Sequence, residues 1–185
     1  MIDLKPACDR MIGLLTHVAD GQLISSTPCV EYTVEDLIDH VDRVSRGFSA
    51  LAHKDPGEQT DTDGRPTAVN LGNGWRDSVT KHVWALGEAW DDPAAWQGSA
   101  SAGDLDMPNE LWGKIALTEM VVHGWDLAKA TGQLFDLPEK TLRACFDHVA
   151  RFVPNAPVEG LWGPAIDVPD NALLLDRIVA ITGRS

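Results

Sequence analysis

Apolar residues recur every three or four positions through most of the chain, which is the spacing of amphipathic α-helices. Glycine- and proline-containing segments separate five such stretches, and a sixth, shorter one closes the chain. The predicted helices cover residues 4–19, 33–53, 76–90, 108–131, 138–152 and 170–181. Because helix follows helix with no sustained alternation, the pattern predicts an all-α protein.

Several predicted helix ends carry their own signals. Thr33 and Asp36 have the spacing of a capping box, in which each side chain bonds the other residue's backbone N–H. Gly21 marks the end of the first helix, and Gly132 suits the residue that follows the fourth. Pro108 is well placed in a first helical turn. These signals predict where the polypeptide leaves and enters its helices.

Two connecting segments lack periodicity. Residues 54–75 hold repeated glycines and prolines among acids and threonines, which predicts a long loop, and loops of this length are usually functional or mobile. Residues 96–107 are rich in glycine, serine and alanine, and we expect a connector with short extended pieces at most. Antiparallel helices joined by long crossover loops predict a four-helix bundle that carries additional short helices.

Composition narrows the class of protein. A chain of 185 residues with 44% hydrophobic and 23% charged residues fits one globular domain spanning residues 1–185. A formal net charge of −13 disfavours binding to nucleic acid or to anionic lipid, because those affinities come from lysine and arginine. No apolar stretch is long enough to cross a bilayer and no secretion signal begins the chain, so we expect a cytoplasmic protein without membrane partners.

The three cysteines favour neither a disulfide framework nor a zinc knuckle. Cys8, Cys29 and Cys145 are an odd number and are widely spaced, which is typical of reduced structural thiols. Cys29 precedes a predicted helix start, where a thiolate could be stabilised by the helix dipole. The structural interpretation is the favoured one for all three.

The strongest chemical signal is Glu119 and His123, one turn apart on a predicted helix that is apolar almost all the way round. In helical projection both lie away from the side marked by Lys114, Thr118 and Lys129, so they point inward. A buried carboxylate and imidazole must pair, find other hydrogen bonds or bind a cation. The pair is therefore either a buried ion pair or half of a metal site.

His40 lies on the flank of the apolar stripe of the second predicted helix and can reach the interior. Taken alone, it is more simply a core-edge histidine that donates to a backbone carbonyl. With Glu119 and His123 it completes two histidines and a carboxylate, the ligand set of catalytic zinc sites with an open coordination position. Asp126 could orient a ligand from behind, or could equally be a charged residue near the helix end. The remaining histidines, His17, His53, His82 and His148, are interpreted as structural, with His148 near the polar side of the fifth predicted helix.

Three segments resemble a known family. Residues 27–40 are similar to its approach to the second helix with the first ligand, and residues 119–132 to its motif with the glutamate and second histidine. Residues 163–183 resemble the tail of its short members. On these motifs the chain is identified as a member of the DinB-like metal-binding bundles of actinobacteria, which share a domain with mycothiol-dependent maleylpyruvate isomerase.

The resemblance implies a divalent metal, zinc or else nickel or another ion, held by His40, Glu119 and His123. It further implies a low-molecular-weight thiol such as mycothiol at the open position, a small electrophilic substrate and a homodimer. The isomerase has an additional C-terminal domain at its substrate site, so we expect a thiol-dependent transferase or isomerase rather than that one activity. Two alternatives stay open: a metal- or ligand-binding bundle without turnover, and a structural bundle without metal.

Overall fold

The computed structural model describes residues 1–55, 71–156 and 162–185. The elements in chain order are α1 (Lys5–Thr16), the 3-10 turn η1 (Asp20–Gln22), α2 (Val34–His53), α3 (Trp75–Ala89), η2 (Pro93–Trp96), β1 (Ser99–Ala102), β2 (Leu105–Pro108), α4 (Asn109–Thr131), α5 (Glu139–Phe152), η3 (Val153–Asn155) and α6 (Leu174–Ile181). The all-α prediction is confirmed.

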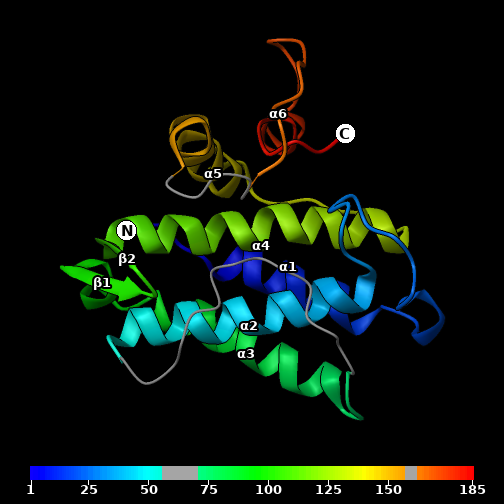
Figure 1. The fold of residues 1–185 in the computed structure, drawn as a ribbon, viewed down its shortest axis with the longest axis horizontal. Helices are drawn as coiled ribbons and strands as arrows, with labels where there is room; N and C mark the ends of the chain where they lie inside the picture. The colour runs from blue at the N-terminus through cyan, green and yellow to red at the C-terminus, as the bar shows by residue number, and fades with distance from the viewer. Residues whose placement is uncertain (56–70, 157–161) are drawn as a thin grey trace.

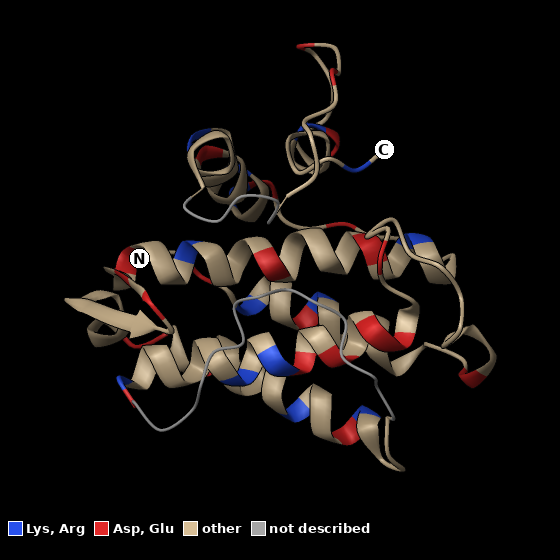
Figure 2. Cartoon of the chain, viewed as in Figure 1, with Lys and Arg blue, Asp and Glu red and all other residues tan. Residues whose placement is uncertain are grey.

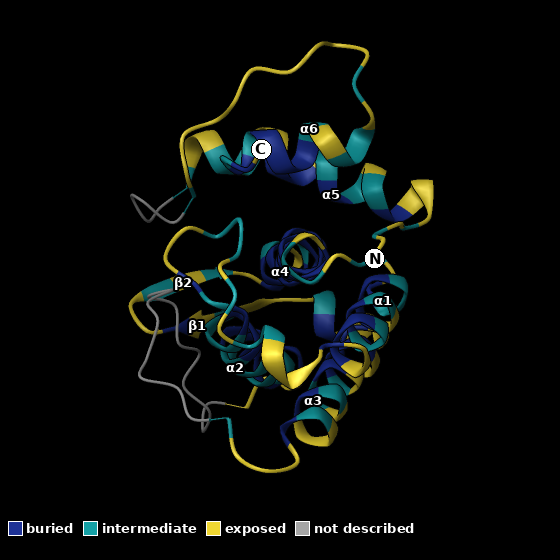
Figure 3. Ribbon diagram, turned by 90° about the vertical axis from the view of Figure 1, so that its right-hand side faces the viewer, coloured by how far each residue is buried: buried dark blue, intermediate teal, exposed yellow. Residues whose placement is uncertain are grey.

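The first four helices form the predicted bundle. Helix α2 packs on α3 and α4, and α1 packs on the same two helices from the other side (Figure 1). Helices α5 and α6 pack against each other and lie across α4 from the other three, as the end-on view shows (Figure 3). The bundle therefore carries an extra helical layer on its longest helix.

Helix α4 is buried on all sides because it lies between these two layers (Figure 3). Uncharged residues make up most of its length, as Figure 2 shows. The predicted polar side is wrong at Thr118, which is buried and hydrogen-bonds the Lys114 carbonyl at 3.0 Å. The second layer covers that side, where Thr118 Oγ1 lies 3.8 Å from the Cys145 Sγ of α5. Polar groups on α4 must consequently find partners inside the protein.

The capping box before α2 is confirmed: the Asp36 backbone N–H donates to Thr33 Oγ1 at 3.3 Å, and the Thr33 N–H donates to Asp36 Oδ2 at 2.9 Å. Gly132 follows α4 with φ +70°, as its C-cap position requires. The predicted end of the first helix is wrong, because α1 stops at Thr16 and Gly21 lies within η1. The other boundaries agree within a few residues.

The short extended pieces expected within residues 96–107 are present, and they pair into a hairpin that the sequence did not predict. Strands β1 and β2 pair antiparallel in register from Ser99 opposite Pro108 to Ala102 opposite Leu105. Gly103, with φ +56°, begins the two-residue turn between them, so a glycine-first turn was the available signal. Of the predicted 54–75 loop, residues 56–70 lie outside the described residues. No helix in the described part of the chain combines the length and hydropathy needed to traverse a bilayer.

Candidate metal centre

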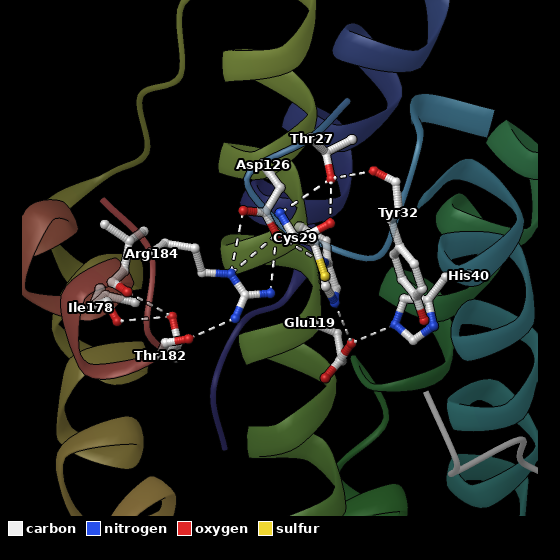
Figure 4. A network of polar contacts seen from close by, with 11 residues as sticks. Thr27, Cys29, Tyr32, His40, Glu119, Asp126, Ile178, Thr182 and Arg184 are labelled. Atoms are coloured by element: carbon white, nitrogen blue, oxygen red, sulfur yellow. Dashed lines mark hydrogen bonds and ion pairs between the residues drawn. The ribbon is translucent and has the colours of Figure 1, made fainter. Parts of the chain in front are cut away.

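The three predicted ligand residues meet inside the bundle. His40 comes from α2, while Glu119 and His123 come from successive turns of α4, and each is less than a tenth exposed. His40 Nε2 lies 3.1 Å from Glu119 Oε2, and His123 Nε2 lies 3.2 Å from the same oxygen. Two imidazoles from different helices therefore converge on one carboxylate oxygen, and Figure 4 shows the approach of His40 to Glu119.

Glu119 is held ionised by its neighbours. Burial would raise the pKa of its carboxyl, but hydrogen bonds from His123 and His40 hold that pKa well below its usual range. Because the net shift of the Glu119 pKa is downward, the two imidazoles outweigh desolvation. A negative charge is thus kept at the centre of an apolar bundle.

Asp126 contacts the His123 ring from behind, which is one of the two roles that the sequence left open for it. His123 Nδ1 lies 3.0 Å from Asp126 Oδ2, and because a carboxylate accepts, Nδ1 carries a proton. In a neutral ring Nε2 is then a bare lone pair facing Glu119 Oε2, which also accepts. That contact requires either a second proton on the ring or a cation between the two atoms.

The protonated form is favoured when no cation is present. Burial alone would lower the pKa of His123, but its hydrogen bonds to Asp126 and Glu119 raise it to about 9. His40 behaves oppositely, because burial lowers its pKa despite the bond to Glu119. The two histidines of the cluster are therefore inequivalent in the charge they carry.

His40 also differs in its support. Its Nδ1 is buried and has no hydrogen-bond partner in the part of the chain that the structure describes, and its ring lies 5.5 Å from the ring of Tyr32, centroid to centroid. The two imidazole centroids, of His40 and His123, are 4.7 Å apart in an edge-on arrangement. The predicted bond from His40 to a backbone carbonyl is not the contact that its Nε2 makes.

The donor set fits a divalent cation. Ligand atoms about 2.0 to 2.1 Å from a tetrahedral zinc ion are roughly 3.3 to 3.4 Å from one another. The distances from Glu119 Oε2 to the two Nε2 atoms are 3.1 and 3.2 Å, and the three candidate ligand atoms all lie within 4.8 Å. Little movement would thus be needed to admit an ion.

Cys29 lies beside this cluster, which the sequence did not predict. Its Sγ is within 4.8 Å of ligand atoms of His123 and Asp126 (Figure 4). The Thr27 hydroxyl accepts from the Cys29 backbone N–H at 3.1 Å and fixes this loop. Burial raises the pKa of the thiol to about 11, so the thiolate idea based on a helix dipole is not supported. Cys29 is a protonated neighbour of the centre near neutral pH.

Two of the remaining histidines, His82 and His148, make contacts within the protein, and the position of His148 differs from the prediction. His82 Nδ1 bonds Asp42 Oδ1 at 2.7 Å, linking α3 to α2. His148 was predicted near the polar side of its helix but is buried, stacked on Phe152 at 4.8 Å between centroids. The covering of α5 by the rest of the protein explains the difference, since helical projection alone does not show which face packs.

These features define a class of protein, an all-α bundle with two histidines and a carboxylate converging in its core. The chain belongs to the family described as the mycothiol maleylpyruvate isomerase N-terminal domain, whose sequence model matches residues 4–128. All three candidate ligands lie inside the matched range. The family resemblance noted from the motifs is therefore confirmed.

Relatives and solved structures agree with this placement. The uncharacterized proteins Rv0738 and MT0763 of Mycobacterium tuberculosis, strains H37Rv and CDC 1551, are each 31% identical to the chain over 97% of its length and 94% of theirs. Two crystal structures of a mycothiol-dependent maleylpyruvate isomerase, one of them of a mutant, match with TM-scores of 0.60 and 0.57 at 17% and 18% identity. The matches cover 79% of this chain and 66% of those chains, and the shared DinB-like fold is what they show.

Proposed function

We propose that the protein binds one divalent metal ion through His40, Glu119 and His123 and uses a low-molecular-weight thiol, such as mycothiol, to transfer or isomerise a small electrophile. Zinc is the expected ion, because two imidazoles and a carboxylate suit it, with nickel as an alternative. We further propose that residues 1–185 form one domain that works in the cytoplasm as a homodimer, as the family resemblance implies.

The convergence of both Nε2 atoms on Glu119 Oε2 is the observation that supports this function most directly. Three protein ligands leave a coordination position open, and such sites bind water or a reacting molecule rather than only stabilise the fold. The family assignment supports a thiol in particular, since the isomerase after which the family is described depends on mycothiol.

The protein's own residues would prepare the site. Glu119 supplies the negative charge, His40 and His123 supply neutral nitrogen ligands from two helices, and Asp126 keeps the His123 ring in one orientation. A bound divalent cation would lower the pKa of a thiol at its open position and so convert it to a nucleophile near neutral pH. The apolar surroundings of α4 would exclude competing water from the chemistry.

One observation also favours the structural alternative. The Glu119 carboxylate is already satisfied by two histidines, and a protonated His123 makes the cluster a buried ion pair without any metal. Protein purified without chelators should nevertheless contain about one equivalent of a divalent ion, measured by mass spectrometry. A content below about a tenth of an equivalent would leave only the ion pair.

Catalysis needs a separate experiment. The metal-loaded protein should consume small electrophiles in the presence of an added thiol, and the rate should require both thiol and metal. Turnover that proceeds equally well in a chelator, or no turnover with any thiol while metal is bound, would instead leave a metal-binding bundle without thiol-dependent chemistry.

The pH dependence of metal affinity follows from the state of His123. The sequence alone predicts that metal is released below about pH 6 to 6.5, where a free imidazole takes a proton. Because the pKa of His123 is raised to about 9, a proton competes for its Nε2 from that pH downward. The apparent zinc affinity, measured against a chromophoric chelator, should fall about tenfold for each pH unit below 9. A zinc affinity that stays the same between pH 9 and pH 7 would contradict the assignment of His123 as a ligand.

A further inference from the structure

Arg184, one residue from the end of the described chain, is buried although it is an arginine in a tail. Its side chain is 7% exposed, and the residue follows α6, in the layer on the far side of α4 from α2. Burying a guanidinium is costly unless its donors are used and its charge is paired. The contacts that it makes therefore explain why the tail turns inward here.

The guanidinium of Arg184 donates hydrogen bonds to two partners, Asp126 and the Thr182 carbonyl. Its Nε lies 3.3 Å from both oxygens of Asp126, and its Nη2 lies 3.2 Å from Asp126 Oδ2. Its Nη1 donates to the Thr182 carbonyl at 2.7 Å, and its guanidinium lies 5.5 Å from the Trp162 ring centroid. Figure 4 shows the guanidinium between Thr182 and Asp126. A forked donor thus meets both oxygens of one fully buried carboxylate.

The backbone of the tail holds the arginine in this place. The Arg184 N–H donates to the Val179 carbonyl at 2.9 Å, and the Gly183 N–H donates to the Ala180 carbonyl at 3.0 Å. Gly183 has φ +80°, so the chain reverses direction directly before the arginine. The side chain is therefore directed at α4 by the end of α6 rather than by chance contact.

A continuous polar chain results, running from the second helical layer into the bundle. Arg184 contacts Asp126, Asp126 bonds His123, and His123 and His40 both bond Glu119. A planar guanidinium fixes the plane of the carboxylate that it pairs with, which a single hydrogen bond to His123 would not. The pairing with Arg184 therefore determines the direction in which the Asp126 Oδ2 lone pair points toward His123 Nδ1.

We propose that Arg184 is a positioning residue for the centre: it holds the Asp126 carboxylate in the orientation that keeps a proton on His123 Nδ1, so that His123 Nε2 faces Glu119 as the ligand atom. The role in metal binding rests on the proposed function, whereas the placement of the Nδ1 proton does not. Arg184 lies outside the matched residues 4–128, so the C-terminal segment contributes to a centre whose ligands come from elsewhere.

The experiment compares Arg184→Gln and Arg184→Lys with a matched loss of charge, Arg177→Gln. Arg177 is an arginine of the same segment whose guanidinium stacks on Phe146 at 4.3 Å from the ring centroid. Zinc affinity is measured by chelator competition. The Nδ1–H signal of His123 is followed by proton–nitrogen NMR in the metal-free protein, where its hydrogen bond to Asp126 should slow exchange with solvent.

Arg184→Gln should weaken zinc binding by about 10- to 100-fold, the usual loss when support behind a metal ligand is removed. The His123 Nδ1–H signal should be lost to exchange in this variant. Arg184→Lys keeps the charge without the planar fork, so it should also lose affinity, by a smaller factor. Arg177→Gln should match the unsubstituted protein in both measurements.

Unchanged zinc affinity and an unchanged Nδ1–H signal in either folded Arg184 variant would overturn the proposal. If Arg184→Gln does not fold, Arg184→Lys decides. If the unsubstituted protein binds no zinc, the metal function fails while the NMR comparison still tests Arg184: a signal lost on substitution supports the positioning of His123, and a retained signal refutes it. An equal effect in Arg177→Gln would also refute it, because any lost arginine would then suffice.

Discussion

Replacing His123 with alanine should lower zinc affinity by about 100- to 1,000-fold and abolish thiol-dependent turnover. A structural zinc site contributes roughly 10 to 16 kcal/mol through four ligands, so one ligand accounts for about 2.5 to 4 kcal/mol, and each 1.4 kcal/mol is tenfold. The loss is large because Asp126 fixes the His123 ring, whereas the Nδ1 of the other histidine, His40, has no hydrogen-bond partner among the described residues. Affinity is measured by chelator competition, and turnover with an added thiol.

The matched control is His82→Ala. His82 is also a histidine bonded to a carboxylate, Asp42, but that pair links α3 to α2 and includes none of the three candidate ligands. Zinc affinity and turnover should be unchanged in this variant. If His123→Ala binds zinc as tightly as the unsubstituted protein, the ion is held elsewhere and the proposed centre is only a buried ion pair.

Much of the scaffold was predictable because its signals are local. The apolar spacing gave the helices, the reciprocal bonds of Thr33 and Asp36 set the start of α2, and Gly132 ended α4 in the left-handed conformation that favours glycine. The inward direction of Glu119 and His123 followed from the same periodicity. Where one face of a helix is exposed to water, the spacing of apolar residues identifies the buried face.

The faces of α4 and α5 could not be read in this way. Helix α4 has partners on both sides, so a threonine such as Thr118 is buried against Cys145 although its helical position resembles that of two lysines. His148 is buried for the related reason that α5 forms part of the second layer. Projection onto a helical wheel gives relative directions, whereas the packing of layers decides which direction is exposed.

The surroundings of the centre depend on contacts far apart in sequence. His40 and Glu119 are separated by 79 positions and Asp126 and Arg184 by 58. Ligand type and the family resemblance joined the first pair, and nothing in the sequence joined the second. Cys29 likewise reaches His123 through a loop that Thr27 folds back on itself. Convergence of this kind is a property of topology, which local propensity does not encode.

The two helical layers have a joint consequence for the centre. The ligands lie on the α2 side of the polar chain, while the positive charge that pairs with Asp126 comes from the tail after α6. Asp126 is fully buried between them, so neither layer alone completes the set of contacts. A change that detaches the tail should therefore alter the position of His123, even though no ligand has been substituted.

Gly183→Ala should be such a change, and it should destabilise the protein by about 2 to 4 kcal/mol. At φ +80° an alanine adopts a strained backbone conformation, and its Cβ would lie 2.6 Å from the Cα and the carbonyl carbon of Gly163. Backbone atoms cannot rotate away as a flexible side chain can, so the tail must move. Thermal unfolding should shift downward by about 2 to 4 °C for each kcal/mol.

Gly132→Ala separates backbone strain from this close approach. Gly132 also has a left-handed φ, +70°, but a Cβ there would meet no atom of the described residues within 4 Å. It should cost only about 1 kcal/mol, and it should leave zinc affinity unchanged.

Gly183→Ala should in addition weaken zinc binding, because Arg184 is the next residue and would be drawn away from Asp126. Equal losses of stability in the two variants would mean that the tail is not packed against Gly163 as described. A Gly183→Ala variant that is destabilised but keeps full zinc affinity would show that the tail does not influence metal binding at the centre.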